Sequence, residues 1–147
     1  MKFRTIALVA IGIALSNSQF QIVSRAQSSN TIWQGVYTVA QAERGAEQYS
    51  ARCASCHATD LRGNSNSPSL LGLSFMFIWE GKSLGEIYSK MRNEMPTDQP
   101  GSLSAQTYSD ILAFILRANE FPAGSTELES NAAALNQITI TSRATSN

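Results

Sequence analysis

The chain has 147 residues and carries eleven acidic and eleven basic side chains. This length fits one small domain, and the charge balance is not that of a nucleic-acid-binding protein. With only two cysteines and one histidine, the chain cannot supply the four Cys or His ligands of a structural zinc site or the four thiolates of an iron–sulfur cluster.

The first 26 residues have the pattern of a secretory signal peptide. Lys2 and Arg4 precede an apolar run over residues 6–15, and Ser24-Arg25-Ala26 places small residues at the −3 and −1 positions of a cleavage site after Ala26. The run is about half as long as a membrane-spanning helix. We therefore expect a periplasmic protein that contacts a membrane only if the signal segment is retained. Without residues 1–26, the exported chain has eight basic and eleven acidic residues.

A helix is expected over residues 39–51, after an exported N-terminal extension at residues 27–36. Thr38 and Gln41 match the S/T-x-x-E/Q capping box that opens a helix. Gly45 and Tyr49 are four residues apart and therefore share one helical face. A glycine notch beside an aromatic ring on that face suits close crossing by another helix.

Directly after this helix stands Cys53-Ala54-Ser55-Cys56-His57, the C-x-x-C-H attachment signature of a c-type haem. Two thiols at this spacing can each form a thioether with one vinyl group of the same porphyrin, and the adjacent imidazole then reaches the iron. We expect Cys53 and Cys56 to attach one haem c covalently and His57 to be its proximal ligand. A thioredoxin-like dithiol is the competing interpretation, but it belongs near a βαβ pattern. No such pattern is present, and no disulfide is expected.

The chain after this motif alternates between loops and apolar segments. Residues 59–69 are rich in Asn, Ser and Gly and are expected to form a loop. The apolar residues 70–79 then resume the core and offer Phe75, Phe77 and Trp79 as walls for a flat hydrophobic ligand.

Two further helices are predicted by their caps and apolar spacing. Ser83 begins a second capping box and a helix that ends near residue 92, and Ser104 caps the most strongly patterned helix, which ends near residue 118. Between them, residues 95–101 contain two prolines and a glycine and are expected to form an irregular loop. The tail at residues 125–147 is expected to dock partly, through Leu135, Ile138 and Ile140.

The sixth iron ligand is sought among the methionines, because a single histidine excludes bis-histidine ligation within one chain. Core packing explains Met76 in its aromatic run and Met91 on the apolar stripe of its helix. Met95 lies in a loop, outside any apolar periodicity and directly before Pro96. The pattern therefore favours Met95 as the sixth ligand, with Met91 second and an open sixth site third.

In this order, the motifs resemble the class I monohaem cytochromes c over residues 36–124. The resemblance rests on the C-x-x-C-H motif, the Gly45 and Tyr49 pair, the sequence Pro68-Ser69-Leu70, the Met95-Pro96 step and a closing helix with an aromatic residue near its start. It implies an all-α fold at residues 37–124, with about four helices around one covalent haem. It also implies that the Pro68 carbonyl accepts the proton on the outer nitrogen of His57.

Two details refine the resemblance. Residues 37–45, 79–81 and 119–124 are similar to haem domains found beside, or fused to, quinoprotein alcohol dehydrogenases. Ala58 departs from the pattern, since relatives usually carry glycine after the haem histidine.

The resemblance implies an electron carrier that cycles between Fe(III) and Fe(II) and turns over no substrate itself. Its expected partners are redox proteins: a periplasmic dehydrogenase of the quinoprotein type as donor, and an oxidase or another cytochrome of a respiratory chain as acceptor. The alternative is a haem enzyme or a gas or redox sensor with an open sixth coordination site. Against an enzyme, the sequence offers no evident distal His or Arg acid–base pair.

Overall fold

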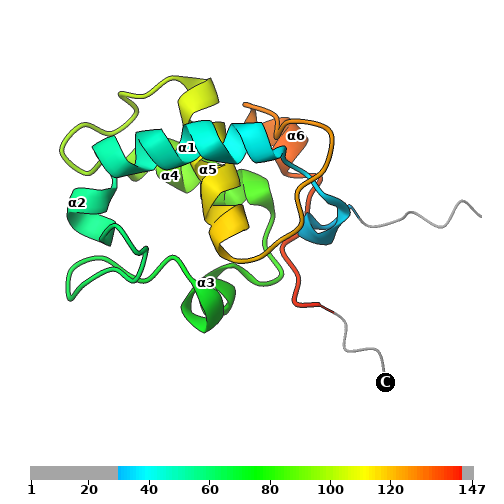
Figure 1. Cartoon of the computed structure of the whole chain (residues 1–147), viewed down its shortest axis with the longest axis horizontal. Helices are drawn as coiled ribbons and strands as arrows, with labels where there is room; N and C mark the ends of the chain where they lie inside the picture. Colours follow the sequence, from blue (N-terminus) through cyan, green and yellow to red (C-terminus); the bar gives the residue numbers. More distant parts are fainter. Residues whose placement is uncertain (1–29, 144–147) are drawn as a thin grey trace, which may run out of the picture.

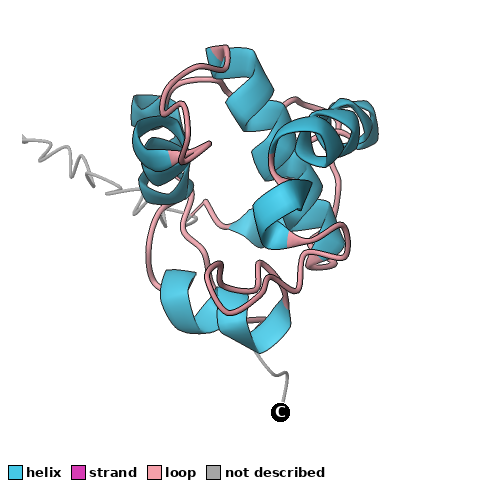
Figure 2. Cartoon of the chain, turned by 90° about the vertical axis from the view of Figure 1, so that its left-hand side faces the viewer, coloured by secondary structure: helices cyan, strands magenta, loops and turns pink. Residues whose placement is uncertain are grey.

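The structure, a computed structural model, describes residues 30–143 (Figure 1), so the expected signal peptide lies outside the described residues. Within that range the regular elements are helices, joined by loops and isolated bridges (Figure 2). This confirms the all-α expectation. None of the helices described is long and apolar enough to cross a membrane.

Three long helices follow the predicted ones closely, and short helices lie between and after them. In chain order the elements of residues 30–143 are the 3-10 helix η1 (Ile32–Gln34), α1 (Val39–Arg52), α2 (Ala54–His57), α3 (Gly72–Trp79), α4 (Leu84–Glu94), α5 (Ala105–Ala118) and α6 (Ala132–Leu135). The caps at Thr38, Ser83 and Ser104 all form, because each side chain accepts a hydrogen bond from a backbone N–H in the first turn.

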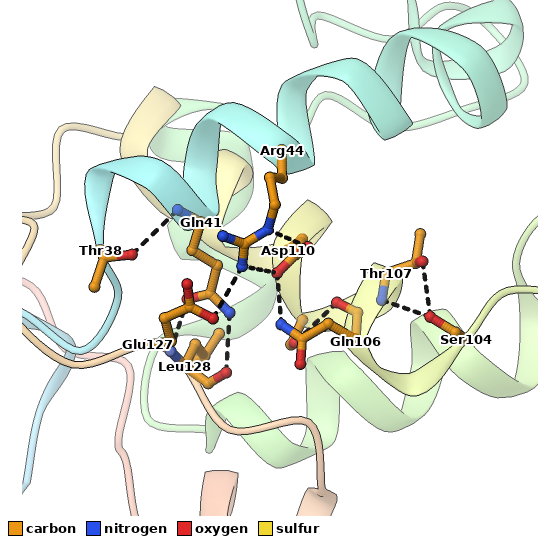
Figure 3. A network of polar contacts seen from close by, with 10 residues as sticks. Thr38, Gln41, Arg44, Ser104, Gln106, Thr107, Asp110, Glu127 and Leu128 are labelled. Atoms are coloured by element: carbon orange, nitrogen blue, oxygen red, sulfur yellow. Dashed lines mark hydrogen bonds and ion pairs between the residues drawn. The ribbon is translucent and has the colours of Figure 1, made fainter.

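The capping box expected at Thr38 is only half formed. Gln41 turns away from the helix end and pairs with the backbone of Leu128: its Nε2 donates to the carbonyl oxygen at 3.0 Å, and its Oε1 accepts from the N–H at 2.7 Å (Figure 3). Both side chains are buried. A buried amide gains more from two backbone partners than from one exposed cap, so Gln41 fastens the C-terminal segment to α1.

The centre of the fold is the crossing of α1 and α5 at Gly45. A Cβ atom built at Gly45 would lie 1.8 Å from the carbonyl oxygen of Asp110, so only glycine permits this approach. Tyr49 packs against Phe114 with 5.2 Å between ring centroids. Arg44 closes the same crossing through a two-pronged ion pair with Asp110 at 3.0 Å (Figure 3). The predicted notch at Gly45 and Tyr49 is therefore confirmed.

The C-terminal segment passes beside the start of the described chain and the α3–α4 turn (Figure 1). Ile140 exchanges backbone hydrogen bonds of 2.8 Å with Gly81 and Lys82, and Thr139 accepts one of 3.1 Å from Ile32. Leu135 and Ile140 are fully buried, while Ile138 is half-buried against the core. Residues 128–140 thus contribute to the core of the domain.

The placement of α3 corrects one expectation about the cavity walls. Phe77 is 93% exposed and Leu73 is 90% exposed, whereas Phe75 and Trp79 are buried. Residues four apart share a helical face and residues two apart do not, so Phe75 and Trp79 face inward together and Phe77 faces outward. Phe77 therefore walls no internal ligand, and Phe75 packs against Phe121, with 6.2 Å between ring centroids, rather than lining the cavity. Of the three expected wall residues, Trp79 alone lines it.

Asn119, at the C-terminal end of α5, holds the beginning of α3. Its Nδ2 donates to the Leu70 carbonyl oxygen at 2.8 Å, and its Oδ1 accepts from the Gly72 N–H at 2.7 Å. The segment that leads into α3 is thereby tied to the main helix of the core.

Candidate functional site

A cavity of about 830 Å³ opens between α1, α2, α3, α4, α5 and the loop after α4, and all four site residues expected from the sequence line it: Cys53, Cys56, His57 and Met95. Apolar side chains from α3, α4 and α5 form much of its wall, namely Ile78, Trp79, Ile87, Ile111 and Ile115. Its size and apolar lining are those of a site for a small molecule or a cofactor.

Cys53, Cys56 and His57 reach the cavity from a single helical turn. The Cys53 carbonyl oxygen accepts from the N–H groups of Cys56 and His57 at 3.1 and 2.9 Å, so positions i, i+3 and i+4 lie on one face. Cys53 is half-buried and Cys56 is exposed. Burial raises the pKa of the Cys53 thiol to about 11, against the lowering effect of Arg52. This pKa applies to the thiol before haem attachment, because a thioether has no titratable proton.

His57 is held by the loop that follows it. Its Nδ1 lies 3.3 Å from the carbonyl oxygen of Pro68, the contact that the family resemblance implies. Asn64 donates to the Cys56 carbonyl oxygen at 2.8 Å, and the Gly63 N–H donates to the His57 carbonyl oxygen at 3.0 Å. With the proton on Nδ1 shared with Pro68, Nε2 keeps the lone pair that binding to a metal requires.

Ala58 occupies a backbone conformation that favours glycine. Its φ is +63° and its ψ is 156°, a region in which a Cβ atom is crowded by the backbone and which costs a non-glycine residue about 1–3 kcal/mol. The chain enters this conformation as it leaves α2, and the Ala58 carbonyl oxygen accepts from the Tyr49 phenol at 2.8 Å. The structure thus gives a physical reason why glycine suits this position.

We expect Ala58→Gly to raise the free energy of unfolding of the haem-loaded protein by about 1 kcal/mol, because it relieves this strain by more than the extra entropy that glycine gives the unfolded chain. Thermal melts followed by circular dichroism measure the change. Ala40→Gly, at an exposed helical position of α1, is the matched control and should lower stability. A lower melting temperature for both variants would show that Ala58 is unstrained.

Two methionines also line the cavity. Both Met91, in the last turn of α4, and Met95, the residue that ends this helix, line the cavity. The sequence explains Met91 by core packing and leaves it as the second candidate ligand, and its position at the cavity keeps that alternative open. Met76 packs against the core and is absent from the cavity wall. The cavity therefore narrows the thioether candidates to Met91 and Met95.

The donor set fits a haem c. Two thiols on one turn match the two vinyl groups of a porphyrin, an imidazole and a thioether are iron ligands, and the remaining wall suits an apolar macrocycle. Within residues 30–143 no three His, Cys, Asp or Glu side chains cluster to hold a bare metal ion. The side chains therefore suit an iron that already has four porphyrin nitrogens.

Residues 40–115 match the family model described as "Cytochrome C oxidase, cbb3-type, subunit III". The match runs from the first turn of α1 to α5 and includes every residue expected to contact the haem. The chain belongs to this cytochrome c family. No curated protein matches it. A solved structure that does is the sulfane dehydrogenase SoxCD from Paracoccus pantotrophus, at 22% identity, a TM-score of 0.46 and coverage of 78% of this chain and 61% of that chain.

Membership confirms the expected class I cytochrome c and its cofactor. A cytochrome c domain binds haem c covalently, and Cys53 and Cys56 fit the attachment motif. It also implies electron transfer with redox proteins as partners. Sequence reasoning missed the contact of Tyr108, whose hydroxyl lies 2.6 Å from the Met95 carbonyl oxygen. No local sequence pattern predicts this contact, since it arises from the packing of α4 on α5.

Proposed function

We propose that this cytochrome c is an exported one-electron carrier whose haem iron is held by His57 and Met95. The observation that carries the proposal is that these two side chains line the same cavity from separate elements, α2 and the loop after α4. When bound there, haem c supplies an iron that exchanges one electron between Fe(III) and Fe(II).

The residues of the chain support electron exchange rather than the turnover of a substrate. Pro68 fixes the ring of His57 through Nδ1, and the walls from α3, α4 and α5 are apolar. A thioether from Met95 would hold the iron together with His57, and oxygen and peroxide would then find no free site. Methionine also stabilises the ferrous state, which raises the potential and favours acceptance of electrons from a dehydrogenase.

We assign a periplasmic location, a quinoprotein-type dehydrogenase as donor and a respiratory oxidase or cytochrome as acceptor. The signal-peptide pattern at residues 1–26 supports export. The similarity of residues 37–45 and 119–124 to haem domains of quinoprotein alcohol dehydrogenases supports the donor class. The oxidase named in the family description supports a respiratory acceptor. The acidic balance of the exported chain favours a basic docking patch on either partner.

The donor is tested by mixing ferric, haem-loaded protein with a quinoprotein alcohol dehydrogenase and its alcohol, while the ferrous spectrum is followed. We expect reduction at a rate that falls as salt is raised, because complementary charges speed the encounter. A nicotinamide-dependent alcohol dehydrogenase with the same alcohol and cofactor is the control and should give no reduction. Equal reduction by both enzymes, or by neither, would contradict the donor assignment.

A further inference from the structure

Met95 is held by its backbone. Its N–H donates to the Met91 carbonyl oxygen at 3.0 Å, which continues the hydrogen bonding of α4 by one residue. Its carbonyl oxygen accepts from the phenol of Tyr108 at 2.6 Å. By contrast, the polar contact that residues 30–143 make with the Met95 sulfur is a long one, of 3.9 Å, from the exposed Thr97 hydroxyl. These two hydrogen bonds fix the backbone of Met95 and leave its thioether available to the cavity.

Tyr108 is a rigid donor. Its side chain is 1% exposed, and it stands in the first turn of α5, the helix that crosses α1 at Gly45. Its ring packs edge-on against Tyr88, with 6.5 Å between centroids and 81° between planes. A buried phenol held in this way cannot swing to another acceptor without disturbing the packing of α4 on α5.

Tyr108 also links the loop after α4 to a helix, which the backbone hydrogen bonds of the loop do not. The other backbone hydrogen bonds of residues 96–102 that the structure describes stay inside the loop, from Gln99 to Pro96 and from Ser102 to Gln99. These turns shape the loop but do not fix it to a helix. The contact with Tyr108 ties the first residue of the loop, the one that carries the thioether, to α5.

We propose that Tyr108 is the positioning residue for Met95, holding its carbonyl oxygen so that the thioether stays on the iron. This inference rests on the proposed ligand role of Met95. Loss of the phenol should let the iron–sulfur bond open more often while the ring continues to fill its place in the core. An exchange that needs this opening, such as the binding of cyanide by the ferric protein, reports the effect directly.

The experiment compares ferric, haem-loaded wild type with Tyr108→Phe and Tyr88→Phe. Tyr88 is the matched control, because it is equally buried and packs against the ring of Tyr108. Its hydroxyl lies 2.7 Å from the Ser130 carbonyl oxygen and 3.2 Å from that of Ala105, and so has its acceptors away from Met95. One net hydrogen bond corresponds to about a fivefold change in an equilibrium. We expect cyanide binding about fivefold faster in Tyr108→Phe and within about twofold of wild type in Tyr88→Phe.

A rate within twofold of wild type for Tyr108→Phe, or an equal acceleration in both variants, would overturn the positioning role. If wild type lacks the sulfur-to-iron band at about 695 nm, the ligand role of Met95 fails first and this inference fails with it. If Tyr108→Phe does not fold, the proton NMR spectrum of the ferrous wild type decides. A slowly exchanging Tyr108 hydroxyl proton with cross-relaxation to Met95 or Pro96 supports the inference, and a rapidly exchanging one overturns it.

Discussion

Replacing both Cys53 and Cys56 with alanine should remove the covalent haem and, with it, the folded domain. The cavity of about 830 Å³ lies among α1, α3, α4 and α5, and buried apolar residues such as Trp79, Ile111 and Ile115 line it. Without haem these side chains would face water or an unfilled space, and a domain of this size has only about 5–15 kcal/mol of stability to lose. We therefore expect a largely unfolded chain.

The test is circular dichroism of the exported double variant during a thermal scan. We expect low helicity and no cooperative transition, together with a mass that lacks the haem. Ser55→Ala is the matched control, because Ser55 lies between the two cysteines and is exposed. That variant should keep both the haem and a melting curve like that of wild type. A cooperative, native-like transition in the haem-free double variant would show that the helices pack without the cofactor.

Gly45→Ala should lower the free energy of unfolding of the haem-loaded protein by about 3 kcal/mol. The added Cβ would lie 1.8 Å from the Asp110 carbonyl oxygen and 2.4 Å from its carbon, and both are backbone atoms that no side-chain rotation can move away. The helices α1 and α5 must separate to admit it. This movement weakens the contact of Tyr49 with Phe114 and the ion pair of Arg44 with Asp110.

Thermal melts should show a loss of roughly 10 °C for Gly45→Ala. Ser50→Ala, at an exposed position of the same helix, is the control and should change stability by less than about 0.5 kcal/mol. Alanine ordinarily stabilises a helix relative to glycine, so propensity and packing predict opposite signs at Gly45. A melting temperature at or above that of wild type would contradict the close crossing.

Local patterns were sufficient to predict the long helices and one wall of the site. Thr38, Ser83 and Ser104 mark helix starts because each cap is a contact within four residues, and the C-x-x-C-H turn depends on spacing alone. In α3 the sequence is apolar on all sides, so periodicity identified neither the helix nor its outward residue Phe77.

Contacts between distant segments were not predictable in the same way. Gln41 satisfies the rule for a capping box, yet its amide pairs with Leu128, 87 residues away. Met91 fits the apolar stripe of its helix, and only the packing of α4 shows that the stripe ends at the cavity. The link from Tyr108 to Met95 joins a helix to a loop, and no spacing rule describes it. Burial and tertiary packing determine these contacts, and neither can be deduced from local sequence spacing.

Optical spectra of the ferric, haem-loaded protein through the red and near-infrared test the central claim most directly, recorded for wild type, Met95→Ala and Met91→Ala. We predict a weak band at about 695 nm that disappears in Met95→Ala and persists in Met91→Ala. A band lost in Met91→Ala instead would move the sixth ligand to Met91. A wild-type protein without the band and with a high-spin spectrum would contradict His/Met ligation and favour an enzyme or sensor with an open sixth site.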